Sequence, residues 1–280
     1  MTAAGRMDRR AARDPGDAVA PAFAWSAGGL RYEICGQGPD LVLVHEMGGS
    51  LESFDTLAAL LAPRFRILRY DQRGAGGSAR APRGMTIADH ARDLADLLGE
   101  TGVTQVRGLL GIAAGAAVAV SHVAMGGPPE ALILCAPALS VPPERRAYLE
   151  ARSDLARREG MAAVTEASLA RSYPDHLRGD AARYGRYRER FLANDPDDYA
   201  DANMALAASR VPDLLPRLAM PCLVLAGRHD LLRPPEEVRA TCALIPGARY
   251  GEIESGHLMS VQAPEALAAG ILGFLGEHDD

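Results

Sequence analysis

Residues 106–124 restrict the fold of this chain more than any other stretch. An apolar run, Val106 to Leu110, stops at Gly111, and a helical run of small residues follows from Gly115 to Ala124. This order predicts a buried strand, a turn too tight for large side chains, and a helix. The residue at the centre of the turn is Ala113.

The composition is that of a chain able to bury one large α/β core. The chain has 280 residues, of which 48% are hydrophobic, and its formal net charge is −6. A negative net charge gives no reason to expect a nucleic-acid partner or binding to an anionic membrane. All 30 positively charged residues are arginine and none is lysine, so a Schiff-base lysine and a lysine general base are both excluded. The four cysteines are far apart and form no CxxC pair, so we expect no disulfide framework and no metal.

Residues 1–21 are predicted to form a frayed tail, because they are rich in Ala, Arg, Asp, Gly and Pro and lack hydrophobic periodicity. They also lack the apolar core of a signal peptide, and the chain has no apolar run of membrane-spanning length. A cytoplasmic location is therefore the expectation.

Strand and helix patterns alternate along most of the chain. Strands are predicted at 41–44, 65–70, 106–110, 131–135, 222–226 and 249–253, and the runs at 41–44, 131–135 and 222–226 are continuously apolar, as is typical of strands buried in a parallel sheet. Helices are predicted between them, among others at about 52–61 and from Pro264 to Gly276. Between about residues 139 and 216 this pattern gives way to helices broken by prolines, and a structureless loop of that length would be abnormal. We therefore predict an α/β core at 22–138 and 217–280, with a mostly parallel sheet between helix layers, and an inserted helical cap at 139–216.

Five motifs occur in a fixed order along the chain. They are His45-Glu-Met-Gly-Gly, Asp71-Gln-Arg-Gly-Ala-Gly-Gly-Ser78, Gly111-Ile-Ala-Ala-Gly115, Leu225-Ala-Gly-Arg-His-Asp230 and Ser255-Gly-His257. In order and spacing they resemble the loops of the α/β-hydrolase superfamily over roughly residues 22–277, and the pattern looks like the 3-oxoadipate enol-lactonase-like branch. The resemblance implies an α/β-hydrolase fold acting on a small molecule. No dinucleotide fingerprint accompanies the glycine-rich loop at 74–77, so we expect no cofactor.

The resemblance also implies roles for particular residues. Asp230 would accept a hydrogen bond from one ring nitrogen of His257, which would then act as the general base. The backbone N–H groups of Met47 and Ala114 occupy the positions that form the oxyanion hole of the family.

Two positions depart from the family pattern. Ala113 stands where the family has Ser, Cys or Asp, and Glu46 replaces the usual glycine. His45 and Glu46 are candidate substrate contacts, although a histidine at this position more often orients its loop and Glu46 could point to solvent. If Glu46 points inward it needs a partner or a role, because an unpaired buried carboxylate costs several kcal/mol or becomes protonated.

An alanine at position 113 leaves three interpretations open. The favoured one is an enzyme without a covalent intermediate, in which the His257/Asp230 dyad deprotonates water or the substrate itself. Its substrate would be a small lactone, ester or β-dicarbonyl compound, and lyase or other carbon–carbon chemistry is open to the same residues. The second is a Ser-to-Ala variant of an ordinary serine hydrolase, made to trap a ligand. The third is a binding protein on a hydrolase frame, against which the retained base weighs.

The predicted cap is locally basic in an acidic chain. Residues 144–190 contain 11 arginines and 8 acidic residues. Some of these arginines could hold a substrate carboxylate bidentately, while a solvated helix face is the more conservative interpretation. A cap over the sheet implies a small, enclosed pocket with apolar walls. For the assembly, a homodimer is one of the open alternatives.

Overall fold

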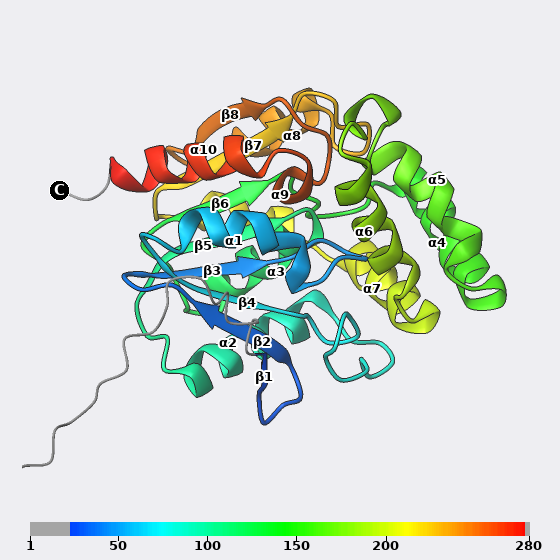
Figure 1. The fold of residues 1–280 in the computed structure, drawn as a ribbon, viewed down its shortest axis with the longest axis horizontal. Helices are drawn as coiled ribbons and strands as arrows, with labels where there is room; N and C mark the ends of the chain where they lie inside the picture. The colour runs from blue at the N-terminus through cyan, green and yellow to red at the C-terminus, as the bar shows by residue number, and fades with distance from the viewer. Residues whose placement is uncertain (1–22, 278–280) are drawn as a thin grey trace, which may run out of the picture.

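Eight strands form one sheet in the computed structural model, which describes residues 23–277 (Figure 1). The strand order is β1-β2-β4-β3-β5-β6-β7-β8, antiparallel at β1–β2 and β2–β4 and parallel at every later pair. The strands are β1 (Ala24–Trp25), β2 (Arg31–Cys35), β3 (Asp40–Val44), β4 (Arg66–Tyr70), β5 (Val106–Ile112), β6 (Leu132–Cys135), β7 (Cys222–Gly227) and β8 (Arg249–Ile253). The predicted mostly parallel α/β sheet is therefore confirmed.

Helices cover both faces of this sheet, which is why its central strands are continuously apolar. On one face α1 (Asp55–Leu61), which follows the short η1 (Leu51–Phe54), packs with α9 (Met259–Gln262) and α10 (Pro264–Gly276). On the other face α2 (Ile87–Thr101) packs against α3 (Ala114–Ala124), and α8 (Pro235–Cys242) packs on β7 and β8. Four residues of β3, Leu41 to Val44, have no exposed surface.

Most of the chain between β6 and β7 is helical. The elements are α4 (Pro143–Glu159), α5 (Ala162–Ser172), η2 (Asp175–Leu177), α6 (Ala181–Leu192), α7 (Pro196–Ala208) and η3 (Val211–Arg217). Figure 1 shows α4 to α7 gathered beyond one end of the sheet, and we call residues 143–208 the helical insertion. It has its own hydrophobic cluster, including Tyr173, Tyr187 and Phe191, which also takes in Leu258 from the loop after β8.

The end of the predicted cap is part of the main core. Val211 and Leu215 of η3 are buried in the large hydrophobic cluster of the sheet, and η3 contacts α3. The predicted tail, residues 1–21, lies outside the described residues. Among the residues that are described, no helix is both long and apolar enough to cross a membrane.

Two glycines allow α3 to approach the strands closely. A Cβ on Gly115 would lie 2.3 Å from the carbonyl oxygen of Val44, and one on Gly111 would lie 2.6 Å from Cα of Ala116. Neither neighbour is the free end of a side chain, so it could not move aside without moving the backbone. The small residues at 111 and 115 thus fix the first turn of α3 against the end of β3.

Candidate active site

The turn between β5 and α3 has the strained backbone that the sequence pattern suggested. Ala113 has φ 50° and ψ −116°, a left-handed conformation that a residue with a side chain rarely adopts. Its N–H donates to the carbonyl of Cys135 at 2.9 Å, and its carbonyl accepts from the N–H of Ala138 at 3.0 Å. Strain of this kind costs about 1–3 kcal/mol. The chain therefore keeps the strained turn although its central side chain is only a methyl group.

His257 and Asp230 meet in the loops that follow β8 and β7. His257 Nδ1 lies 2.8 Å from Asp230 Oδ2, and both side chains are almost completely buried. The other carboxylate oxygen, Oδ1, accepts from the N–H groups of Leu232 at 2.7 Å and Arg233 at 2.9 Å. These bonds fix the carboxylate, which in turn favours the imidazole tautomer with its proton on Nδ1. Nε2 is then the basic nitrogen, and His257 lines the cavity above Ala113.

Two backbone N–H groups at this cavity are available as donors. Ala114 is the first residue of α3, so its N–H has no acceptor within the helix. Met47 follows β3, and among the described residues neither of these two amides has a hydrogen-bond acceptor. Both residues line the cavity. An oxygen atom carrying negative charge could accept from both amides, and the N-terminus of α3 favours such a charge.

His45 orients the loop that carries Met47. Its Nδ1 donates to the carbonyl of Glu46 at 2.7 Å, and its Nε2 accepts from the N–H of Gln72 at 3.0 Å. His45 is buried and lines a smaller neighbouring pocket rather than the cavity above Ala113. With both ring nitrogens bonded to the backbone, His45 has none left for a substrate in this conformation.

The Asp71–Ser78 motif holds the same loop in place through hydrogen bonds to the backbone and to His45. Asp71 is fully buried and accepts hydrogen bonds from Arg31 Nε at 2.6 Å, from the N–H of Leu51 at 2.7 Å and from the N–H of Gly77 at 2.7 Å. A Cβ on Gly76 would lie 2.2 Å from the Asp71 carboxylate. This motif therefore holds three loops together and places Gln72 against His45, rather than contributing a side chain to the cavity.

Glu46 points inward. It is 1% exposed, its Oε1 accepts from Ser53 Oγ at 2.7 Å, and its Oε2 lacks a hydrogen bond of normal geometry within the described structure. The carboxylate is close enough to Tyr187 to raise the pKa of that phenol, which burial already holds well above its usual value. Tyr187 therefore remains protonated beside Glu46, at the wall of the cavity.

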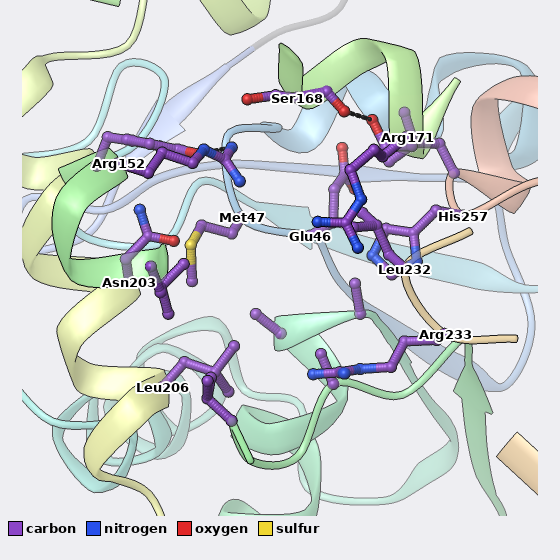
Figure 2. A pocket seen from close by; sticks show the side chains of 18 of the residues that line it. Glu46, Met47, Arg152, Ser168, Arg171, Asn203, Leu206, Leu232, Arg233 and His257 are labelled. Atoms are coloured by element: carbon purple, nitrogen blue, oxygen red, sulfur yellow. Dashed lines mark hydrogen bonds between the residues drawn. The ribbon is translucent and has the colours of Figure 1, made fainter. Parts of the chain in front are cut away.

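The cavity lies between the carboxyl ends of the strands and the helical insertion (Figure 2). Its volume is about 160 Å³, enough for a small organic molecule. Of the predicted site residues, Glu46, Met47, Ala113, Ala114 and His257 line this cavity, whereas Asp230 stands behind His257 and His45 lines the neighbouring pocket. Among the lining residues are four arginines, Arg145, Arg152, Arg171 and Arg233.

Sequence reasoning did not identify these arginines individually. The excess of arginine in residues 144–190 is compatible with a solvated helix face, yet three of those arginines line the cavity. Arg233 follows Asp230 closely in the sequence, which is the one signal that could have drawn attention to it. Many other arginines of the insertion do form surface ion pairs, as Arg157 does with Asp201 and Arg188 with Glu166.

The fold and the elements of this site define a class of protein. Residues 39–264 match the family model described as alpha/beta hydrolase fold, so the chain belongs to that family. The family and the relatives described next place the chain among the hydrolases.

Individual relatives extend this assignment. The chain is 29% identical over 261 residues to the Yersinia enterocolitica protein named "Putative carbamate hydrolase RutD", and the match covers 88% of this chain and 92% of the relative. The structure of this chain is similar to that of the enol-lactonase from Burkholderia xenovorans, with a TM-score of 0.84 and 28% identity over 91% of this chain and 100% of that one. A thermophilic esterase from Thermogutta terrifontis, solved with malate bound, gives a TM-score of 0.83 and 28% identity over 92% and 98% of the two chains. The predicted resemblance to the enol-lactonase-like branch is thus confirmed.

Proposed function

We propose that this hydrolase cleaves a small lactone, ester, carbamate or β-dicarbonyl compound by direct attack of water, without a covalent acyl-enzyme. The observation that carries the proposal is the 2.8 Å hydrogen bond between His257 and Asp230 beside a strained turn that has no nucleophile. A protein that only bound its ligand would have no need of a buried, oriented base.

In the proposed reaction the base acts on a water molecule. His257 Nε2 takes a proton from water above the methyl group of Ala113, and the resulting hydroxide bonds to the carbonyl carbon of the substrate. The electron pair of the carbonyl moves onto oxygen, where the N–H groups of Met47 and Ala114 stabilise it. When the tetrahedral intermediate collapses, the bond to the leaving group breaks and the His257 imidazolium returns its proton to the leaving oxygen, nitrogen or carbon.

The magnitude of catalysis supports the plausibility of this route. A positioned general base contributes about 10²–10⁴-fold, and one oxyanion donor contributes about 10²–10³-fold. Since both are independent of a serine hydroxyl, a useful rate remains when residue 113 is alanine. We also propose that the helical insertion acts as a cap, because residues of α4, α5, α6 and α7 form the wall of the cavity opposite Ala113.

The names of the relatives suggest which bonds to test. One relative is named for carbamate hydrolysis and another for opening an enol-lactone, both of which involve attack on an activated carbonyl. Purified protein should be assayed against aryl esters, small lactones, carbamates and β-diketones, alongside the variants His257→Ala and Ala113→Ser. We expect turnover of at least one class by the unmodified chain and its loss in His257→Ala.

The main competing function is an ordinary serine hydrolase mechanism. The specific observation in its favour is the backbone of Ala113, because φ 50° and ψ −116° would present a serine hydroxyl to the cavity. If the unmodified chain is inert to the whole panel while Ala113→Ser is an efficient esterase that a fluorophosphonate labels, our proposal is wrong and this alternative is right.

A further inference from the structure

The cavity above Ala113 carries an unusual concentration of positive charge for an acidic protein. Four arginines and one carboxylate, that of Glu46, are among its lining residues, although the whole chain has a formal net charge of −6. Arginine is well suited to bind carboxylates because its planar group donates two parallel hydrogen bonds. Within the described residues, two of these guanidinium groups have a carboxylate partner and two do not.

Two of the four arginines share one carboxylate. Arg145 Nη2 lies 2.5 Å from Glu237 Oε1, and Arg233 Nη1 lies 3.7 Å from Glu237 Oε2. Arg145 also donates to the carbonyl of Leu232, and Arg233 donates to the carbonyl of Ser140. These two side chains are therefore tied to the wall of the cavity.

The other two have no carboxylate partner within the part of the chain that the structure describes. Arg171, half-buried at the end of α5, makes no hydrogen bond or ion pair there, and its guanidinium lies 5.8 Å from the ring centre of Tyr148. Arg152 of α4 donates to the hydroxyl of Tyr199, while its buried Nε has no acceptor. Figure 2 shows both guanidinium groups turned toward the middle of the pocket from opposite sides, with Arg171 on the side of His257.

The positive charge gathered at the cavity affects the pKa of Arg233. Burial lowers the pKa of Arg233, and the positive charges of Arg145 and Arg171 lower it further, against the attraction of Glu237 and Asp230. Since like charges destabilise each other in a partly dry cavity, an anion bound there would relieve the repulsion.

We infer that the substrate of the proposed hydrolysis is a small dianion, with one carboxylate on Arg171, a second on Arg152, and the reacting carbonyl between them. The inference rests on the proposed function for the reacting carbonyl, and on the two guanidinium groups without a carboxylate partner for the charges. The cavity volume of about 160 Å³ limits such a molecule to a short chain. The carbonyl then lies toward the N–H groups of Met47 and Ala114 on the core side, and the carboxylates lie toward the helical insertion.

Binding of unreactive probes tests this without requiring turnover. Isothermal titration calorimetry should be run at pH 7.5 with succinate, butyrate and butanamide, which differ in charge at similar length. We expect succinate to bind at least tenfold more tightly than butyrate, and butyrate more tightly than butanamide. Each of the variants Arg171→Met and Arg152→Met should weaken succinate binding about 10–100-fold, the value of a lost charge-assisted interaction.

The chain offers a matched control and a check on folding. Arg158 is on the same helix as Arg152, does not line the cavity, and its side chain is 66% exposed, so Arg158→Met should leave succinate binding unchanged. Arg171→Lys keeps the charge but loses the two-pronged geometry, so it should recover part of the affinity lost in Arg171→Met. Thermal melting of each variant within a few degrees of the parent would show that the fold is intact.

The outcomes separate this inference from the proposed function. Equal affinity for succinate and butyrate, or unchanged succinate binding in both methionine variants, would overturn the dianion inference even if esters are hydrolysed. If succinate binds as expected but no substrate class is turned over, the anion site stands and the proposed function fails.

Discussion

The most decisive prediction concerns Asp230→Asn. Asp230 makes two separate sets of bonds: Oδ1 accepts from the N–H groups of Leu232 and Arg233, and Oδ2 faces His257 Nδ1 at 2.8 Å. Asparagine can keep its oxygen on the two backbone amides, which directs its NH₂ group at Nδ1. Nδ1 must then accept a hydrogen bond, so the ring proton moves to Nε2 and the base is lost.

The size of the effect follows from this tautomer change. A histidine held in the wrong tautomer by this substitution costs about 10⁴-fold in kcat in a serine protease triad. We expect a loss of about 10³–10⁴-fold in kcat/KM here, equivalent to roughly 4–5.5 kcal/mol at about 1.36 kcal/mol per factor of ten. Because the loop bonds survive, the free energy of unfolding should fall by only about 1 kcal/mol or less.

Initial rates below KM on whichever substrate the panel identifies would measure the loss, and ¹⁵N NMR of the histidine rings would report the tautomer. The companion variant Asp230→Ala leaves the two loop amides without an acceptor, so it should lose about 1–3 kcal/mol of stability as well as activity. If Asp230→Asn keeps more than a tenth of the parent kcat/KM, His257 does not act as the base we describe.

Three further predictions test the stability of the frame. Burial lowers the pKa of His90 to about 4. As the pH falls below about 6.5, this histidine is protonated in the unfolded chain before it is protonated in the folded one, so the free energy of unfolding should fall by about 3 kcal/mol between pH 6.5 and 4. In urea titrations, His90→Phe should remove that part of the pH dependence. Gly115→Ala should destabilise the fold by about 1–3 kcal/mol because the new Cβ meets the Val44 carbonyl. The control Gly185→Ala, on helix α6 with open space around it, should stabilise the fold by about 0.5–1 kcal/mol. Equal effects of the two substitutions would contradict the close approach of α3 to β3. Arg69→Met should cost about 3–5 kcal/mol by leaving the buried carboxylate of Glu33 without its partner at 2.5 Å, and a loss below 1 kcal/mol would contradict a stabilising role for this ion pair.

The sequence was most informative where its pattern is set by the sheet. The bounds predicted for β8, Arg249–Ile253, and for α10, from Pro264 to Gly276, are those of the structure. The inner strands β6 and β7 are unbroken apolar runs that are visible without knowledge of their neighbours, whereas β8 lies at the edge of the sheet and only Ile253 of it is buried. The helix predicted at about 52–61 is instead a 3₁₀ turn, η1, followed by α1, because Ser50 and Ser53 cap a separate first turn.

The helical insertion was less predictable for an equally physical reason. Its helix α4 is strongly polar, with only Ser153 and Ala156 fully buried, so hydrophobic spacing does not reveal which side faces the cavity. Arg152 and Arg158 are six residues apart on that helix, and only its packing against α5 and α7 decides that the first lines the cavity and the second faces solvent. Residue type alone does not distinguish an arginine that lines the cavity from one that faces solvent.

The strained turn at Ala113 has two consequences, and the proposed mechanism needs only one of them. In this family the turn raises a nucleophile above the strand, but it also starts α3 at once, which leaves the N–H of Ala114 free at the helix N-terminus and close to Met47. A relaxed turn would reorient that amide, so the proposed mechanism needs the strained turn to aim the Ala114 N–H at the oxyanion. The φ of 50° at Ala113 is therefore compatible with the proposed mechanism as well as with a serine nucleophile, and the variants Ala113→Ser and His257→Ala distinguish the two.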